Sequence, residues 1–192
     1  MSSRALLLAG VLTAMTGGTA ADASAQSNPV AVIETSFGSM TVELFSDQAP
    51  ITVENFLTYA NDGFFAGTIF HRVIQDFMIQ GGGFTPDMSE KTTRDAIKNE
   101  ATNGLQNERG TIAMARTPVV DSATTQFFIN TVDNGSLDHR STDPPGYGYA
   151  VFGRVTDGLD VLDAIAAVSV TNQGPHQNVP VDPVIINSVN VQ

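Results

Sequence analysis

The sequence predicts a mainly β domain in which eight short strands form a closed antiparallel barrel, together with two helices. Short runs rich in β-branched and aromatic residues recur along the chain, and only two segments have the apolar spacing of a helix. Barrel closure removes exposed strand edges, which favours a barrel for a set of short strands. Periodicity alone leaves a sandwich with helices as the alternative, and we expect the barrel.

The first two predicted strands form a hairpin. Val30–Glu34 and Met40–Phe45 flank a turn at Ser36–Ser39. In the second run, apolar residues alternate with Thr41 and Glu43, so one face is expected to be buried and the other solvated. Six further runs complete the set: Ile69–Ile74, Phe77–Gln80, Thr111–Ala115, Gln126–Val132, Tyr149–Val155 and Val184–Val191.

Two segments have helical spacing. In Pro50–Ala60, apolar residues fall at positions i, i+3, i+4 and i+7, with a proline at the start and a glycine beyond the end. In Gly158–Ala167, the apolar residues share one face, and Asp157 is the expected N-cap. The long polar stretches Thr85–Arg109 and Gly135–Gly148 are expected to be surface loops, and loops of that length in a compact domain tend to be functional.

The composition excludes several classes of function. The chain has 192 residues, of which 42% are hydrophobic and 15% charged, as expected for one folded domain. With 9 basic and 20 acidic residues its net charge is −11, which disfavours nucleic acid and anionic membrane surfaces as partners. The absence of cysteine excludes a disulfide, a thiol nucleophile and a thiolate metal site. The sequence contains no G-x-S-x-G motif, so it does not support a serine hydrolase.

The first 25 residues have the organisation of a secretory signal peptide. Arg4 precedes an apolar run, Ala5–Met15, and small residues with A-x-A patterns follow up to Ala25. The run is shorter than the ~20 residues of a spanning helix, so an uncleaved anchor is disfavoured. We therefore expect cleavage after Ala25, leaving residues 26–192 as one exported, soluble domain.

One stretch places polar side chains where strand residues are normally buried. Strand alternation puts Arg72 on the face of Phe70, and Gln80 on the face of Met78. A fixed guanidinium beside apolar residues would form an apolar pocket with a strong donor at its edge. Taken alone, these residues fit better a surface arginine whose stem passes the edge of the core. Gly81–Gly83 is not followed by Gly-Lys-Ser/Thr, so it does not predict a phosphate loop.

Several motifs, in a fixed order, resemble the cyclophilin family of peptidyl-prolyl cis-trans isomerases. They are Phe70-His71-Arg72-Val73-Ile74, Phe77-Met78-Ile79-Gln80-Gly81-Gly82, Gly110-Thr111-Ile112-Ala113-Met114-Ala115, Gln126-Phe127-Phe128-Ile129 and Val151-Phe152-Gly153-Arg154-Val155. The resemblance runs from about Val30 to Val191. It implies an eight-stranded antiparallel barrel capped by two helices, and the short connections and leader are similar to the exported bacterial branch.

The resemblance also implies roles for nine residues. Arg72 falls on the catalytic arginine, and Gln80 is expected to orient it or the substrate carbonyl. The proline pocket is expected to comprise Phe77, Met78, Phe128 and Leu137. Ala115 and Gln126 fall beside the bound peptide, and Tyr149 takes a position often held by histidine. This chemistry needs no nucleophile, metal or cofactor.

Two positions depart from the family pattern. Ser136 stands where many members carry a bulky ring, so weak binding of cyclosporin-type macrocycles is expected. Arg116 replaces an asparagine that is common in eukaryotic members.

Histidines outside the motif roles are expected to be structural or solvated. His71 should point away from the face of Arg72, while His139 and His176 fall in loops. A metal site built from His139, Asp138 and Asp143 is the alternative, and we expect solvated loop side chains and no metal.

The sequence therefore predicts a monomeric prolyl isomerase of the periplasm, with secretion from the cell as the alternative destination. Its partners are expected to be proline-containing segments of unfolded or partly folded exported proteins, without nucleic acid and without membrane insertion after cleavage. The alternative function is a proline-binding chaperone module whose turnover is incidental. Arg72 favours the isomerase, because binding alone needs only the apolar pocket.

Overall fold

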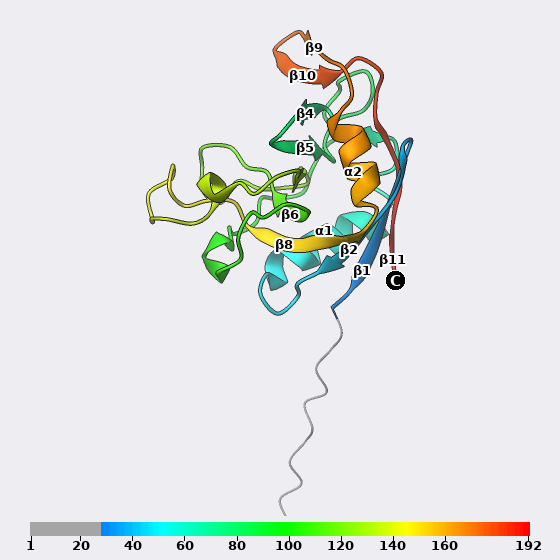
Figure 1. Ribbon diagram of the computed structural model, residues 1–192. Coiled ribbons are helices and arrows are strands. Elements are labelled where there is room, and N and C mark those ends of the chain that lie inside the picture. The colour runs from blue at the N-terminus through cyan, green and yellow to red at the C-terminus, as the bar shows by residue number, and fades with distance from the viewer. Residues whose placement is uncertain (1–27) are drawn as a thin grey trace, which may run out of the picture.

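The computed structural model describes residues 28–192, which fold around one curled antiparallel sheet (Figure 1). The expected signal peptide, Met1–Ala25, lies outside the described residues. The strands of this sheet are β1 (Val30–Thr35), β2 (Gly38–Leu44), β3 (Thr68–Ile69), β4 (Arg72–Ile74), β5 (Met78–Gly81), β6 (Thr111–Met114), β7 (Phe127–Asn130), β8 (Val151–Asp157) and β11 (Ile185–Val191). They follow the order β3-β11-β1-β2-β8-β6-β7-β5-β4.

The sheet is an open half-barrel of nine strands, so the expected closed eight-stranded barrel is wrong. The predicted strand Ile69–Ile74 is in fact two strands, β3 and β4, at opposite ends of the sheet order. Between them the chain changes partners: β3 pairs with β11, and β4 pairs with β5. Because β3 and β4 follow each other in one extended segment, they cannot form a ladder with each other and close the sheet.

The same break changes which residues share a face. Phe70 lies between the two strands and donates its N–H to the carbonyl of Val184 at 2.9 Å. Its ring is fully buried in the inner core, beside Val73 and Ile79. The alternation that predicted Phe70 on the face of Arg72 is therefore wrong, because it assumed one uninterrupted strand.

Two helices lie where the apolar spacing predicts them. α1 (Pro50–Asn61) packs on β11, and α2 (Leu159–Ala166) packs on β2. The N-cap of α2 is Gly158, with φ of 88°, whereas the expected cap, Asp157, is the last residue of β8. A Cβ atom at Gly158 would lie 2.3 Å from the carbonyl oxygen of Ser39, so this cap position requires glycine. No helix among the described residues is long and apolar enough to cross a membrane.

A second, two-stranded sheet lies above β4 in Figure 1. It consists of β9 (Val170–Gln173) and β10 (His176–Pro180), and β10 packs on β4. The sequence does not predict this hairpin, because all four residues of β9 are exposed and show no apolar alternation.

Apolar side chains form two clusters, one on each face of the curled sheet. The inner cluster contains five fully buried phenylalanine side chains: Phe56, Phe65, Phe70, Phe127 and Phe152. The outer cluster consists of Met78, Ala113, Phe128 and Val151, with partly buried Ile74, Phe77, Leu105, Ala115, Leu137 and Tyr149 packed against it. Alternation along β5 and β7 separates the two clusters, so Ile79 and Phe127 face inward while Met78 and Phe128 face outward. The outer cluster positions the candidate site.

Candidate functional site

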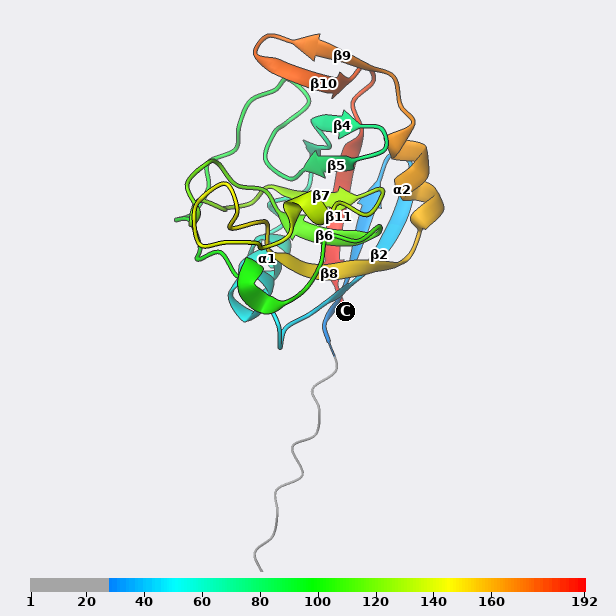
Figure 2. The same ribbon diagram turned by 60° about the vertical axis from the view of Figure 1, so that its left-hand side comes forward.

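A cavity of about 260 Å³ opens on the outer face of the sheet. Figure 2 shows the strands beneath it, with β4, β5, β7 and β6 one below another. The cavity is lined by Arg72, Phe77, Met78, Gln80, Ala115, Arg116, Phe128, Leu137 and Tyr149. A concave site with apolar walls and a few polar groups is typical of ligand binding.

Strand register brings the polar and apolar residues of this site together. Arg72 pairs with Gln80, Gln80 pairs with Phe128, and Phe128 pairs with Ala113. Residues directly opposite each other in neighbouring strands point to the same face. One row across four strands therefore places a guanidinium, an amide and an aromatic ring side by side over the outer cluster.

The Arg72 side chain is held by its neighbours on β5. Its Nη1 donates to the Oε1 of Gln80 at 3.3 Å and lies 4.0 Å from the sulfur of Met78. Half-burial lowers the pKa of the Arg72 guanidinium from its ordinary value, and Tyr149 opposes this effect. Arginine nevertheless stays protonated at physiological pH, so the site contains a permanent cation.

The amide of Gln80 links Arg72 to a second amide. Gln80 Nε2 donates to Gln126 Oε1 at 3.0 Å, and Gln126 Nε2 lies 3.5 Å from Glu90 Oε1. Gln126 lines a neighbouring cavity of about 180 Å³ that shares Gln80, Ala115 and Arg116 with the first. The structure therefore brings eight of the nine predicted residues to one cavity and places Gln126 at the adjoining one.

The apolar wall opposite Arg72 comes from two loops. Leu137 ends a 3-10 turn, η2 (Gly135–Leu137), and its carbonyl accepts a hydrogen bond from the N–H of Tyr149 at 3.0 Å. The Tyr149 ring meets that of Phe128 edge to face, with centroids 5.6 Å apart and planes at 80°. Edge-to-face contacts of this kind fix ring orientation. Ser136, the expected departure from the family pattern, is exposed and does not line the cavity.

A buried amide network supports this wall from behind. Asn134 Nδ2 donates to the carbonyl of Phe77 at 2.8 Å and to Asn130 Oδ1 at 2.8 Å, and its carbonyl accepts from the N–H of Leu137 at 2.8 Å. Asn134 thereby ties Phe77 and Leu137, which both line the cavity, to one buried side chain. Asn134 could not be recognised from the sequence, because a loop asparagine that acts on a backbone group 57 residues away produces no periodic pattern.

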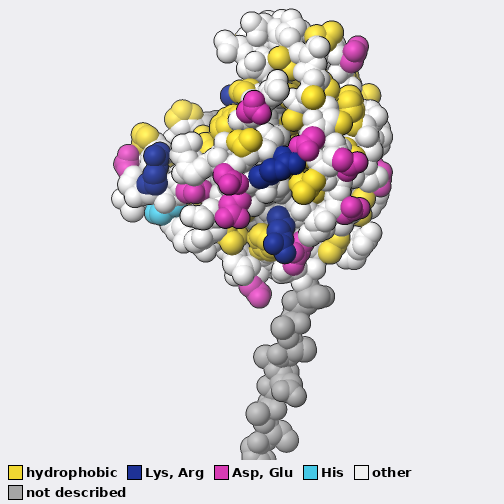
Figure 3. Space-filling model, in the orientation of Figure 1, with side chains coloured by type: hydrophobic (Ala, Val, Ile, Leu, Met, Phe, Trp, Pro, Cys, Tyr) yellow, Lys and Arg dark blue, Asp and Glu magenta, His cyan; other side chains and the backbone are white. Residues whose placement is uncertain are grey.

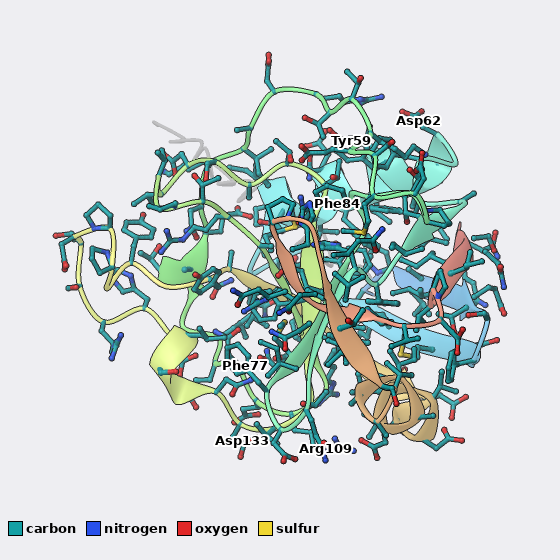
Figure 4. All side chains as sticks on the ribbon, turned by 90° about the horizontal axis from the view of Figure 1, so that it is seen from above. Tyr59, Asp62, Phe77, Phe84, Arg109 and Asp133 are labelled. Carbon is teal, nitrogen blue, oxygen red and sulfur yellow. The ribbon has the colours of Figure 1, made fainter. Side chains whose placement is uncertain are left out.

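The imidazole of His71 lies outside the cavity. It is buried, its ring centroid is 4.6 Å from that of Phe84, and its Nδ1 has no hydrogen-bond partner among the described residues. Figure 4 shows Phe84 beside the β9–β10 hairpin, where His176 packs edge-on against it at 5.2 Å. Burial, followed by the charges of His176 and Arg72, lowers the pKa of His71 to about 4. His71 is therefore a neutral packing residue at neutral pH.

The three residues of the alternative metal site, His139, Asp138 and Asp143, each contact other protein groups. His139 Nδ1 lies 2.8 Å from the carbonyl of Tyr147, and Asp138 Oδ1 accepts from the backbone and side chain of Asn107 at 2.7 and 3.0 Å. Asp143 accepts from Ser141. Over residues 28–192, no three histidine or carboxylate side chains are close enough to hold a metal ion.

Comparison with known proteins gives one consistent result. The family model described as cyclophilin type peptidyl-prolyl cis-trans isomerase matches residues 30–191. A peptidyl-prolyl cis-trans isomerase of Streptomyces antibioticus is 58% identical over 83% of this chain and 96% of its own length. Peptidyl-prolyl cis-trans isomerase A of Dickeya dadantii is 49% identical over 100% of this chain and 98% of its own length. Peptidyl-prolyl cis-trans isomerase B of Escherichia coli is 55% identical over 82% of this chain and 96% of its own length.

Solved structures agree with the sequence relatives. A cyclophilin-type isomerase of Cryptosporidium parvum superposes with a TM-score of 0.74 and 26% identity, covering 86% of this chain and 98% of its own. A structure of the same protein in the presence of the dipeptide Ala-Pro gives a TM-score of 0.73 and 27% identity, covering 85% and 98%. The chain therefore belongs to the family of cyclophilin-type peptidyl-prolyl cis-trans isomerases.

Proposed function

We propose that this chain accelerates rotation about X-Pro bonds by donating a hydrogen bond from Arg72 to the prolyl nitrogen. The observation that carries the proposal is a guanidinium fixed beside the apolar wall of a cavity of about 260 Å³. Membership of the isomerase family supports the reaction class. The described residues supply a donor and a hydrophobic surface together, as this reaction requires.

The chemistry follows from the electronic structure of the amide. Rotation breaks amide resonance and meets a barrier of roughly 18–20 kcal/mol. In the planar ground state the prolyl nitrogen shares its lone pair with the carbonyl, whereas in the twisted transition state the lone pair is localised and can accept a hydrogen bond. A donor aimed at that nitrogen therefore stabilises the transition state more than the substrate, which is the condition for catalysis.

Arginine suits this role because its guanidinium remains charged and transfers no proton. The contact between Arg72 and Gln80 holds the guanidinium in place before substrate arrives. Preorganised donors need little rearrangement during the reaction, which makes their effect on the barrier large. Gln80 is thus a positioning residue for Arg72.

The apolar wall would hold the proline ring while the rest of the peptide turns. Phe77, Met78, Phe128 and Leu137 line the cavity without a charged group of their own. The Cryptosporidium parvum relative was solved in the presence of Ala-Pro, which is the dipeptide that such a pocket would accommodate. Gripping the ring on one side of the X-Pro bond lets the other side rotate past the donor.

The test compares Arg72→Ala with Arg154→Ala in an assay of cis-to-trans relaxation of an Ala-Pro peptide. Arg154 is an exposed arginine on β8 that pairs with Glu43, so it is a matched control for loss of one surface cation. We expect Arg72→Ala to lower kcat/KM by about 100-fold, as the loss of a preorganised transition-state donor does, and Arg154→Ala to have little effect. Peptide binding by Arg72→Ala, measured by NMR titration, should persist.

Two outcomes would contradict the proposal in different ways. If the folded wild-type protein does not accelerate relaxation, the binding-module alternative replaces the isomerase. If Arg72→Ala retains full activity, the isomerase stands but the donor is another group. The family relationship and the guanidinium over the pocket both favour catalysis over binding alone.

We also propose that the enzyme acts on exported proteins in the periplasm. The support is the leader-like composition of Met1–Ala25, with Arg4 before an apolar run and A-x-A patterns at its end. X-Pro bonds in unfolded chains isomerise in about 10–100 s without a catalyst, which is slow enough to limit folding. Protein recovered from the periplasmic fraction should begin at Gln26, and recovery of the intact chain from the cytoplasm alone would refute this localisation.

A further inference from the structure

Arg116 lies at the boundary between two cavities. It lines the cavity of about 260 Å³ that Arg72 also lines, and the adjoining cavity of about 180 Å³. Its guanidinium lies over the ring of Tyr149, with Cζ 4.8 Å from the ring centroid. A peptide that places its proline in the first cavity and continues into the second therefore passes this guanidinium.

Three backbone carbonyl groups fix the Arg116 guanidinium. Nε donates to Gly148 at 2.9 Å, Nη1 to Thr117 at 3.0 Å and Nη2 to Pro144 at 2.9 Å. A guanidinium has five N–H donors, so these bonds leave two for a ligand. Carbonyl groups orient the cation but do not neutralise it, so the positive charge stays in a fixed position at the edge of the site.

Neither arginine of the cavity has a carboxylate partner within the described part of the chain. The three ion pairs found there use Arg94, Arg109 and Arg154. Lys91, Lys98 and Arg140 are in no ion pair there either, so the two arginines differ from these three cations in lining the cavity. Figure 3 shows acidic side chains spread among the arginine and lysine side chains on one face of the molecule.

The acidic groups near the site are kept apart from its first cavity, whose lining contains no Asp or Glu. Glu90 lines only the second cavity and lies next to the amide of Gln126. Asp138 accepts two hydrogen bonds from Asn107. The first cavity therefore holds two cations, Arg72 and Arg116, and no anion.

We propose that Arg116 determines specificity, and that with Arg72 it makes this isomerase favour segments that carry an acidic side chain next to the proline. The inference rests on the proposed isomerase function and names its substrate class. A carboxylate beside the proline would accept the free N–H groups of Arg116 and would face two fixed cations. A lysine in the same place would face two like charges. Complementary charge in an interface acts mainly through such discrimination between partners.

The test measures kcat/KM for three peptides that differ at the residue before proline: Glu-Pro, Gln-Pro and Lys-Pro. A second set places the same three residues after proline, and each rate is compared with the uncatalysed rate of that peptide. We expect the Glu peptide to exceed the Gln peptide by about fivefold in one of the two sets, with Lys below Gln. The advantage should shrink in 0.5 M KCl, because salt screens charge–charge interactions.

Variants of Arg116 separate its charge from its role in holding the loop. Arg116→Gln loses the charge, and we expect it to abolish the preference for Glu over Gln. Arg116→Lys keeps the charge but lacks the planar array of donors that fixes the guanidinium to its three carbonyl groups, and we expect it to retain part of that preference. Arg140→Gln is the matched control, since it removes one exposed cation that lies outside both cavities. The ratio of Glu to Gln rates is the readout, because any general loss of activity cancels in it.

Failure of this inference is distinct from failure of the proposed function. If the wild-type protein accelerates Glu, Gln and Lys peptides equally in both sets, the inference is overturned and the isomerase stands. A preference that survives in Arg116→Gln also overturns the role of Arg116. If no peptide is accelerated, the proposed function fails as well.

Discussion

At the scale of single residues, the site depends on the close approach of the Gln126 side chain to the backbone of Gly83. Gly83 follows β5 and lies against Gln126, so a Cβ atom at position 83 would be 2.6 Å from Cγ and 3.0 Å from Nε2 of that side chain. Gln126 in turn accepts from Gln80, which holds Arg72. Because Gly83 has no side chain, Gln126 can occupy the position in which it hydrogen-bonds Gln80, and Gln80 in turn hydrogen-bonds the Arg72 guanidinium.

We expect Gly83→Ala to displace Gln126 and to lower kcat/KM by about tenfold, through loss of one to two hydrogen bonds in the chain. The backbone at Gly83 does not have a positive φ, so the substitution should leave the free energy of unfolding within about 1 kcal/mol of wild type. The measurement is peptide relaxation together with urea unfolding. In a Gln126→Ala background the added methyl group should have no further effect, and an undiminished tenfold loss there would contradict this explanation.

The row formed by Arg72, Gln80 and Phe128 could be predicted from sequence, whereas the residues that support it could not. Arg72, Gln80 and Phe128 lie in strand motifs that resemble a known family, and their faces follow from alternation along short strands. Asn134 acts on the backbone of a residue distant in sequence, and nothing in its neighbourhood indicates that partner. Arg116 was visible only as a departure from a family pattern, because its three acceptors are carbonyl groups that only folding brings together.

At the scale of elements, helix α1 begins without a cap of its own. Its N-cap, Ala49, makes no side-chain hydrogen bond. Instead Glu100, from the long loop before β6, accepts from the N–H groups of Ile51 and Thr52 at 3.1 and 2.8 Å and from the Thr52 hydroxyl at 2.6 Å. A carboxylate is favourable there because the first N–H groups of a helix are unpaired and carry partial positive charge.

We expect Glu100→Ala to lower the free energy of unfolding by about 1–2 kcal/mol, the range for loss of an N-cap with a favourable charge. Urea unfolding monitored by circular dichroism measures this change. Glu108→Ala, which removes an exposed carboxylate of the same loop that makes no side-chain hydrogen bond, is the control and should change stability by less than about 0.5 kcal/mol. Equal losses in the two variants would mean that Glu100 acts as a general surface charge and not as a cap.

Elements with a strong apolar pattern could be predicted from the sequence. Strands whose bounds depend on which other strand they pair with could not. Both helices lie within about one residue of their predicted bounds, because an amphipathic stripe specifies a helix locally. The division of Ile69–Ile74 into β3 and β4 reflects a change of pairing partner, which no local pattern records. The exposed hairpin of β9 and β10 lacks the alternation by which a half-buried strand is recognised.

At the scale of the whole molecule, one buried imidazole connects stability to pH. The His71 ring packs against that of Phe84, and His176 and Arg72 add an electrostatic effect to that of burial. Its pKa falls from 6.5 to about 4, with burial as the main cause. Between these values the unfolded chain binds more protons than the folded one, so stability rises with pH across this window and is lost as the pH falls through it.

We expect the free energy of unfolding to fall by up to about 3 kcal/mol through His71 alone as the pH decreases from about 6.5 to about 4. Urea unfolding of the wild type and of His71→Gln at intervals across this window measures the difference, since carboxylate titration is common to both. An unchanged slope in His71→Gln would show that this imidazole is not the group responsible.

The curled sheet also pairs the beginning and the end of the folded chain. Ala31 on β1 lies opposite Val191 on β11, as Figure 1 shows for the two strands. In the sheet order, β2 and β8 separate these strands from β6, β7, β5 and β4, which carry the cavity. The first and last strands of the folded domain thus lie together, apart from the strands that carry the cavity. The domain can consequently be joined to another protein through either end, or set as an insert within a longer chain, with its substrate path left open.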